Sequence, residues 1–292
     1  MKSKFMLPDA DAPDTRVFLI VIANPRAEYY NVWAARAQLP KRFIEPDRTT
    51  PQYSRQQAIL SKFHASEEAS FLTPNSIDIT SIVSIPFEEN SFIIRFPDQT
   101  ECLVVDPGLE PEKIIEHLDK MGIRPAAILI THGHSDHFAG NEALKERWPA
   151  CPIVIGKTEA EKLTNPMMNL SAMFGLPLTS PPADLTVADG DIYEVVGFRL
   201  KVLEIPGHSS GHVAYQIEEC QPAIVFVGDV IFAGSVGRTD FPDGSFQQLA
   251  QGIREKLFSL PDDAILHPGH GPSTTVGKEK RSNPFVGARA GD

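Results

Sequence analysis

The sequence predicts an α/β protein in which two β-sheets pack face to face with helices on the outside, an αββα sandwich. Two observations predict this architecture. Apolar runs typical of buried strands recur in two successive regions, residues 79–156 and 191–227. Each region is accompanied by segments with the periodicity of amphipathic helices. We expect such a core to hold ligands at the ends of its sheets.

The first β-rich region alternates strands and helices. Pro111 suits the first turn of a helix and Gly122 suits its end. Asp98 and Gln99 have the composition of a hairpin turn. The expected strands are 79–85, 91–96, 102–105, 126–130 and 153–156, and the expected helices are 111–121 and 140–147.

The second β-rich region begins with a hairpin that turns at Gly197. Its expected strands are 191–196, 198–205, 212–218 and 223–227. An amphipathic helix follows, because apolar residues recur at spacings of 3, 4 and 4, namely Phe246, Leu249, Ile253 and Leu257. No sequence repeat relates the two regions.

An apolar cluster lies between Pro166 and Pro177 and consists of Met167, Met168, Leu170, Met173 and Phe174. Two interpretations compete. A methionine-rich mobile segment can line an adaptable substrate pocket. The same spacing also fits a buried helix face.

We expect an N-terminal extension of unknown role, residues 1–75, and a catalytic domain, residues 76–292. Residues 1–15 are rich in Asp and Pro, which predicts a disordered segment or an arm. The other expected elements of the extension are a strand at 17–23 and short helices at 31–38 and 53–63. The extension either contacts another subunit or packs on the core as an appendage, and the sequence leaves the oligomeric state open.

Composition excludes several classes of protein. The net charge of −11, from 27 basic and 38 acidic residues, argues against a nucleic-acid surface, which needs clustered Lys and Arg. No apolar run approaches the roughly 20 residues of a membrane span. Cys102, Cys151 and Cys220 are widely spaced, so neither a disulfide framework nor a sulfur metal site is indicated. A reducing, cytoplasmic location is therefore expected.

The segment from Thr131 to His137 carries the densest chemistry of the chain. Three of the nine histidines and one carboxylate, His132, His134, Asp136 and His137, fall within six positions. The apolar strand expected at 126–130 leads directly into them, so they lie on a loop at the end of a strand. Imidazole and carboxylate together suit Zn, Fe or Mn.

This His-x-His-x-Asp-His pattern resembles the signature of the metallo-β-lactamase fold. Three later segments resemble further motifs of that family: residues 205–212 around His208, residues 226–229 ending at Asp229, and residues 268–271 around His270. The sequence is most similar to the hydroxyacylglutathione hydrolase (glyoxalase II) group, through residues 234–242, 274–277 and 283–285. The resemblance extends from about residue 77 to about residue 287.

The resemblance implies two divalent metal ions, with Zn expected first and Fe or Mn as alternatives. His132, His134 and His208 would bind one ion, and Asp136, His137 and His270 the other. Asp229 would bridge them with one water. The residues support a division into two sets, because seven N and O ligands exceed the three or four that one zinc takes. Asp229 also follows a fully apolar strand, where an unpaired carboxylate would be unfavourable.

Neighbouring residues suggest supporting roles. Asp106, at a strand end, is placed to orient a ligand histidine through its second ring nitrogen. His212 either lines the site or packs in the core. His267 receives no ligand role, and Arg238 with Asp240 fits a structural ion pair or turn.

The expected reaction is hydrolysis of a small-molecule thioester by a metal-bridging hydroxide, with Asp136 and Asp229 as catalytic residues. A thiolate departs without an acid, because the pKa of its parent thiol is about 8.5, whereas an amine does not. Glyoxalase II enzymes carry a helical C-terminal domain that helps bind glutathione. Only 22 residues follow His270, so the sequence resembles the short members that lack it.

Other functions remain open. A lactonase would use the same hydroxide on a cyclic ester. A persulfide dioxygenase would use one iron, held by His132, His208 and Asp229, with open positions for oxygen. The complete second set of ligands argues against the dioxygenase and against a non-catalytic binding module, and the acidic charge argues against a nuclease.

Overall fold

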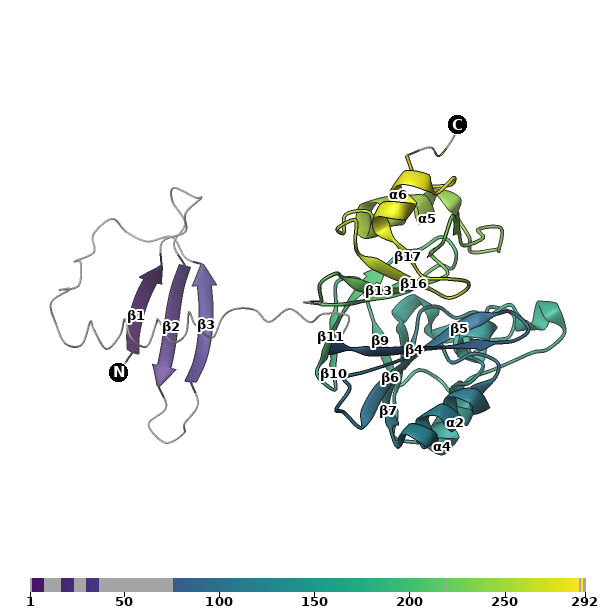
Figure 1. The fold of residues 1–292 in the computed structure, drawn as a ribbon, viewed down its shortest axis with the longest axis horizontal. Helices are drawn as coiled ribbons and strands as arrows, with labels where there is room; N and C mark the ends of the chain where they lie inside the picture. Colours follow the sequence, from purple (N-terminus) through teal and green to yellow (C-terminus); the bar gives the residue numbers. More distant parts are fainter. Residues whose placement is uncertain are drawn as a thin grey trace. The chain divides into compact units, whose positions relative to one another are not determined.

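The computed structural model describes residues 76–218, 220–288 and 290, and the backbone of three strands nearer the N-terminus. The chain divides into two compact units, Met1–Glu68 and Ala69–Asp292. The first unit holds an antiparallel sheet of order β1-β2-β3 (Figure 1). Its strands are β1 (Lys2–Leu7), β2 (Val17–Ala23) and β3 (Tyr30–Arg36).

Two expectations for the extension were wrong. The expected helix at 31–38 is β3, which pairs with β2 from Ala23↔Tyr30 to Val17↔Arg36. Helix propensity is a weak prior, and strand pairing outweighs it in a segment that also contains aromatic and β-branched residues. For residues 1–15 the expectation was a disordered segment or an arm; residues 2–7 form β1, which pairs with β2, so the interpretation as disorder is wrong there. The strand expected at 17–23 is confirmed, and the expected helix at 53–63 lies outside the described residues.

The second unit contains two six-stranded sheets and a small hairpin (Figure 1). The first sheet has the order β4-β5-β6-β7-β8-β9, with β4 (Asp78–Ser84), β5 (Glu89–Arg95), β6 (Glu101–Val105), β7 (Arg124–Ile130), β8 (Ile153–Gly156) and β9 (Leu185–Val187). The second has the order β10-β11-β12-β13-β16-β17, with β10 (Ile192–Val195), β11 (Phe198–Glu204), β12 (Val213–Ile217), β13 (Ile224–Gly228), β16 (Ile265–Pro268) and β17 (Thr274–Thr275). The hairpin is β14 (Ile231–Phe232) with β15 (Ser235–Val236).

Helices cover the outer faces of both sheets (Figure 1). They are α2 (Pro111–Met121), α3 (Ser135–Phe138), α4 (Asn141–Arg147), α5 (Phe246–Gly252) continued by η4 (Ile253–Leu257), and α6 (Val276–Ser282), with short turns η2 (Lys157–Thr164) and η3 (Ser171–Phe174). As expected, Pro111 lies in the first turn of α2 and Gly122 ends it with a left-handed φ of 66°. Among the described residues, no helix has the length and hydrophobicity to cross a membrane.

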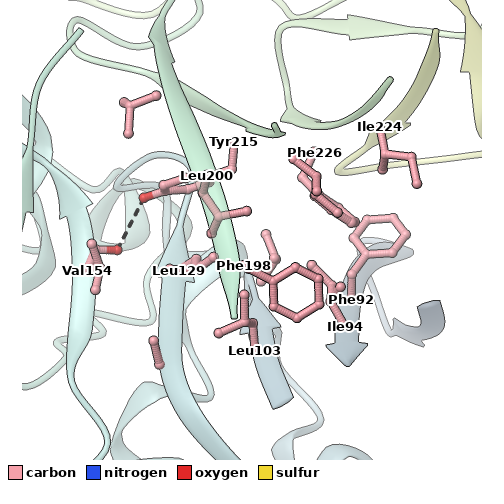
Figure 2. Close-up of a cluster of buried hydrophobic side chains, with 14 of the residues drawn as sticks. Phe92, Ile94, Leu103, Leu129, Val154, Phe198, Leu200, Tyr215, Ile224 and Phe226 are labelled. Atoms are coloured by element: carbon pink, nitrogen blue, oxygen red, sulfur yellow. Dashed lines mark hydrogen bonds between the residues drawn. The ribbon is translucent and has the colours of Figure 1, made fainter. Parts of the chain in front are cut away.

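Three apolar clusters define the layers. The central cluster lies between the sheets, where Phe92 of β5 meets Phe226 of β13 with ring centroids 5.2 Å apart (Figure 2). A second cluster joins the first sheet to α2 and α4, and a third joins the second sheet to α5, η4 and α6. Each helix therefore buries one apolar face against a sheet, which confirms the αββα sandwich.

Tyr215 ties the two sheets together near the candidate site. It is the largest fully buried side chain of the described core. Its hydroxyl donates to the carbonyl of Ile130, at the end of β7, at 3.0 Å, and lies 3.5 Å from the carbonyl of Val154 (Figure 2). Because a buried hydroxyl needs a partner, these contacts hold β12 against the strand that leads into the histidine segment.

The methionine-rich segment is not a buried helix face. Only the short turn η3 forms there, and Met167, Met173 and Phe174 are 69%, 64% and 61% exposed. Leu170 alone of the cluster is buried. The interpretation as a buried helix is therefore wrong, because this apolar surface faces outward instead of packing on a sheet.

Candidate metal centre

The structure brings all seven candidate ligands together, because each lies on a strand end or on the loop or short helix that follows a strand. His132 follows β7, His134 precedes α3, and Asp136 and His137 lie within α3. In the second sheet β11, β13 and β16 run in the same direction, since β12 is antiparallel to β11 and β13, and β13 is parallel to β16. The residues that follow their carboxyl ends, His208, Asp229 and His270, therefore meet at one edge.

Three ring nitrogens form the first group. Nε2 of His132 lies 2.9 Å from Nδ1 of His134. Nε2 of His208 lies 3.2 Å from the His132 nitrogen and 3.0 Å from the His134 nitrogen. Ligand atoms around one tetrahedral ion, with bonds of roughly 2.0–2.1 Å, lie roughly 3.4 Å apart. The triangle therefore has a size that one ion fits.

Hydrogen bonds set the ring orientation of two members of this group. His208 Nδ1 donates to the carbonyl of Arg238 at 2.9 Å, which leaves Nε2 with its lone pair facing the group. His132 Nδ1 lies 3.1 Å from the hydroxyl of Thr131. That hydroxyl donates to Asp106 at 2.7 Å, so it accepts the proton of His132 Nδ1. The inward-facing nitrogens of both rings are therefore free to bind a cation.

The second group combines imidazoles with carboxylates. His270 Nε2 lies 3.5 Å from Oδ2 of Asp136 and 3.6 Å from Oδ2 of Asp229. His137 Nε2 lies 3.5 Å from Oδ1 of Asp229 and 3.9 Å from Oδ2 of Asp136. Asp229 Oδ2 is also 3.5 Å from His208 Nε2 of the first group. The carboxylate of Asp229 thus faces both groups.

The histidines of the second group are oriented in the same way as those of the first. His137 Nδ1 lies 3.1 Å from Oδ2 of Asp106, and His270 Nδ1 donates to the carbonyl of Phe87 at 2.9 Å. Their Nε2 atoms point at the carboxylates. His137 Nε2 and Asp229 Oδ1 are buried without a hydrogen-bond partner. Because a buried polar atom without a partner is unfavourable, this pair fits a cation bound between the two atoms.

The two groups differ in charge. Burial lowers the pKa of His134 to about 3 and lowers the pKa of His132 well below its usual value, so both rings stay neutral. Burial also opposes charge on His137, but Asp229 and Asp136 outweigh it and raise the pKa of His137. The first group is therefore neutral and rich in lone pairs, whereas the carboxylates of the second attract a positive charge. Both properties suit divalent cations.

Asp106 and His212 support the groups from behind. Asp106 lies against His137 Nδ1, where a carboxylate that orients this ring is expected. It also accepts the backbone N–H of Thr131 at 2.8 Å. His212 is fully buried, its Nε2 accepts the backbone N–H of Asp229 at 3.0 Å, and its ring stacks on His132. His212 therefore lies against the site and holds the backbone of Asp229.

Two glycines are required by close packing at the centre. Gly228 has a φ of 47°, and a Cβ there would lie 2.4 Å from the hydroxyl of Thr131. A Cβ on Gly269 would lie 2.4 Å from Oδ1 of Asp229 and 2.5 Å from Cε1 of His137. A larger residue at either position would displace the groups that meet at the centre.

His267, Arg238 and Asp240 lie outside the two groups, as expected. His267 stacks on Phe226 and its Nδ1 bonds to Ser273, and burial lowers the pKa of its ring to about 4. Arg238 forms a two-bond ion pair with exposed Asp240, each bond 2.7 Å long. The three cysteines are buried and free, and no cluster among the described residues contains sulfur.

Sequence reasoning missed several residues of the site. Glu89 is fully buried within reach of Asp106 and His137, and burial raises its pKa well above the usual value. Phe241 packs against His134 with ring centroids 5.1 Å apart. A fully buried carboxylate, Glu159, bonds to the loops of the first group. Phe241 lies in the segment 234–242 that resembles the glyoxalase II group, but that resemblance assigned it no contact. No motif marks Glu89 or Glu159, because their roles depend on neighbours distant in sequence.

Residues 85–270 match the model of the metallo-beta-lactamase superfamily. The chain is 35% identical over 217 residues to hydroxyacylglutathione hydrolase GloC of Haemophilus influenzae, which covers 73% of this chain and 100% of that protein. The chain belongs to the metallo-β-lactamase superfamily.

Solved structures of this superfamily have the same fold. A crystal structure of the B3 metallo-beta-lactamase BLEG-1 matches with a TM-score of 0.68 and 34% identity over 72% of this chain and 99% of that chain. TTHA1623 in a di-iron-bound form matches with a TM-score of 0.62 and 34% identity over 71% of this chain and 100% of that chain. Proteins with this fold thus include one that holds two iron ions in its crystal structure.

Proposed function

We propose that residues 76–292 form a binuclear metal-dependent hydrolase that cleaves small-molecule thioesters of the hydroxyacylglutathione type. The observation that carries this proposal is the position of Asp229, whose two carboxylate oxygens face the first group at His208 and the second group at His137. His132, His134 and His208 would hold one ion, and Asp136, His137 and His270 the other. Zinc is the metal proposed first, with iron or manganese as alternatives.

Two such ions, when bound, supply a hydroxide at neutral pH and polarise the substrate carbonyl. The chain's own residues position these groups. Asp106 and the carbonyls of Phe87 and Arg238 hold protons on the outer ring nitrogens, so the inner nitrogens stay available. The backbone of Asp229 is held by His212. Because these partners are buried or backbone atoms, they keep the site in shape before substrate arrives.

The charge state of Asp136 favours a thioester over an amide. Burial raises the pKa of Asp136, but His137 and the hydrogen bond with His270 outweigh burial, so its pKa is lowered. Asp136 is therefore a carboxylate at neutral pH and carries no proton for a leaving amine. A thiolate leaving group needs no proton, because the pKa of its parent thiol is about 8.5. Asp136 would instead be able to accept the proton of the carboxylic acid that forms when the thiolate leaves.

The surface beside His270 suits an apolar part of the substrate. Phe87, whose carbonyl bonds to His270, lies with its ring centroid 6.2 Å from that of Phe174. Phe174, Met167 and Met173 are all more than half exposed. We propose that this segment makes adaptable, unspecific contact with substrate. Such contact would bind many thioesters weakly rather than select glutathione.

A panel of substrates tests the proposal. It contains S-lactoylglutathione, the same lactoyl group on a small neutral thiol, and a lactone. We expect hydrolysis of both thioesters with high and similar KM values, because the proposed contacts do not recognise the thiol half. A low KM for S-lactoylglutathione alone would contradict the proposed lack of selectivity.

Two outcomes would assign another reaction. Rapid opening of the lactone without thioester cleavage in fully metallated protein would indicate a lactonase. One tightly bound iron with oxygen uptake on glutathione persulfide would indicate a dioxygenase. Metal content and oxygen uptake are therefore measured on the same preparation.

A further inference from the structure

The three histidines of the first group come from loops of different sheets. His132 and His134 follow β7 of the first sheet, and His208 lies between β11 and β12 of the second. One backbone bond joins the loops, from the N–H of Val213 to the carbonyl of Thr131 at 2.9 Å. The ring nitrogens nevertheless meet within 3.2 Å. Further contacts must therefore hold the loops together.

A single carboxylate provides such contacts. Glu159, on η2, accepts the backbone N–H of Gly133, which lies between His132 and His134, at 2.8 Å. The same oxygen accepts the hydroxyl of Ser209, the residue after His208, at 2.7 Å. The other oxygen accepts the N–H of Gly211 at 2.7 Å. Glu159 is thus bonded to both histidine loops at once.

The ammonium of Lys162 completes the arrangement. It bonds to Glu159 at 3.0 Å, to Asp243 at 2.5 Å and to the hydroxyl of Ser209, so its three donors are used. Glu159 and Lys162 are 0% and 2% exposed. Breaking a buried charge pair by removing one partner is strongly unfavourable, because the other charge stays buried without compensation. Replacing either Glu159 or Lys162 alone should therefore be destabilising.

Packing leaves no room for the loop to move toward η2. A Cβ on Gly133 would lie 2.5 Å from Cβ of Lys162. Asp243 Oδ2 also accepts the N–H of Ser210 at 3.0 Å, which fixes the second loop again. The central glycine of the His-x-His pattern thus allows the histidine loop to contact the buried ion pair.

We propose that Glu159 and Lys162 are positioning residues, a buried clamp that sets the spacing of the three histidines and thereby the metal affinity of the first group alone. This inference rests on the proposed metal ligands and not on the thioester substrate. The second group is held by other partners, Asp106 and the carbonyl of Phe87. The clamp should therefore act on one site and leave the other unchanged.

Glu159→Gln tests the clamp, because it keeps the shape of the side chain but places an amide donor either against the donors of Gly133 and Ser209 or against those of Gly211 and Lys162. Zinc affinity is measured by chelator competition in two backgrounds. His270→Ala weakens the second site, and His134→Ala weakens the first. We expect Glu159→Gln to weaken zinc binding about 10- to 100-fold in the His270→Ala background. In the His134→Ala background we expect no change.

Glu279→Gln is the matched control, since Glu279 is also fully buried and accepts the N–H of Gly234 and the amide of Asn283. It should lower thermal stability without changing zinc affinity in either background. The double variant Glu159→Gln/Lys162→Met separates charge from position. If the double variant binds zinc as weakly as Glu159→Gln does, the bonds of Glu159 to the loops set the zinc affinity, and the unpaired charge of Lys162 does not.

Three results would overturn the inference: unchanged zinc affinity in Glu159→Gln despite a lower melting temperature, equal weakening in both backgrounds, or full recovery in the double variant. Because zinc binding is measured without substrate, these results are independent of the substrate panel. If the protein does not hydrolyse thioesters, but Glu159→Gln weakens zinc binding in the His270→Ala background alone, the proposed function is refuted and the clamp is supported.

Discussion

Replacing Asp106 with Asn should weaken metal binding in the second group. Asp106 is 2% exposed and accepts three donors. Oδ1 accepts the backbone N–H of Thr131 at 2.8 Å. Oδ2 accepts the hydroxyl of Thr131 at 2.7 Å and faces Nδ1 of His137 at 3.1 Å. Asn keeps the shape of this side chain but replaces one acceptor oxygen with an NH₂ donor.

The magnitude follows from these contacts. Whichever way the new amide is turned, its NH₂ faces at least one buried donor. A buried donor left without an acceptor costs about 1–3 kcal/mol of unfolding free energy. Loss of a carboxylate behind a ligand histidine typically weakens metal binding about 10- to 100-fold, which corresponds to about 1.4–2.8 kcal/mol. Both effects should be present in Asp106→Asn.

Two measurements separate these effects. Zinc affinity of the second group is measured by chelator competition in the His134→Ala background, and unfolding free energy by denaturant titration. Asp184→Asn is the control, because Asp184 also accepts a backbone N–H, that of Ile153, at 2.8 Å, and does not contact either group. The control should lose stability only. If Asp106→Asn behaves like Asp184→Asn, Asp106 does not orient a ligand and the reasoning is refuted.

Two further predictions concern metal content and pH. Asp229→Ala should lower the metal content below two ions per chain, measured by elemental analysis, because Asp229 faces ligand atoms of both groups. His267→Ala should not lower it, because His267 contacts Phe226 and Ser273 instead. Equal loss in both variants would show a misassigned ligand. The metal-free protein should lose stability as pH falls below about 6.5, because the pKa of His134 is lowered to about 3 and the unfolded chain takes up the proton first. The raised pKa values of His137 and His270 act with the opposite sign, but only above about 6.5. The raised pKa of Glu89 also acts with the opposite sign, and it does so below about 6.5. The test therefore compares denaturant midpoints of the metal-free protein and of metal-free His134→Ala between about pH 6.5 and about pH 5: the variant should lose less stability as pH falls, and an equal loss in both would contradict the lowered pKa of His134.

Sequence alone could predict the sandwich because its strands and helices carry strong local patterns. Residues 126–130 are uniformly apolar, and they form the buried strand β7. Residues 111–121 have a proline start, an apolar face and a glycine end, and they form α2 with those bounds. Where local pattern was weak the prediction failed. Residues 30–36 form β3, because pairing with β2 outweighs helix propensity.

The seven candidate ligands could also be named from sequence, because their motifs are short. His132, His134, Asp136 and His137 lie within six positions at a strand end, and chain geometry alone keeps them close. His208 and His270 each follow a Pro-Gly pair, a local signal as well. That these segments meet at one edge follows from the parallel direction of β11, β13 and β16, which only the sheet topology decides.

Most partners behind the ligands could not be predicted, because they join residues far apart in the chain. The position of Asp106 at a strand end predicted that it orients a ligand histidine, but it did not predict which histidine. The carbonyl of Phe87 reaches His270 over 183 positions, and Glu159 reaches Gly211 over 52. No local pattern distinguishes a buried glutamate that bonds to two loops from an exposed one on a helix. Burial and hydrogen bonding are properties of the folded chain, so tertiary structure alone decides which nitrogen of each histidine faces the site and what keeps it there.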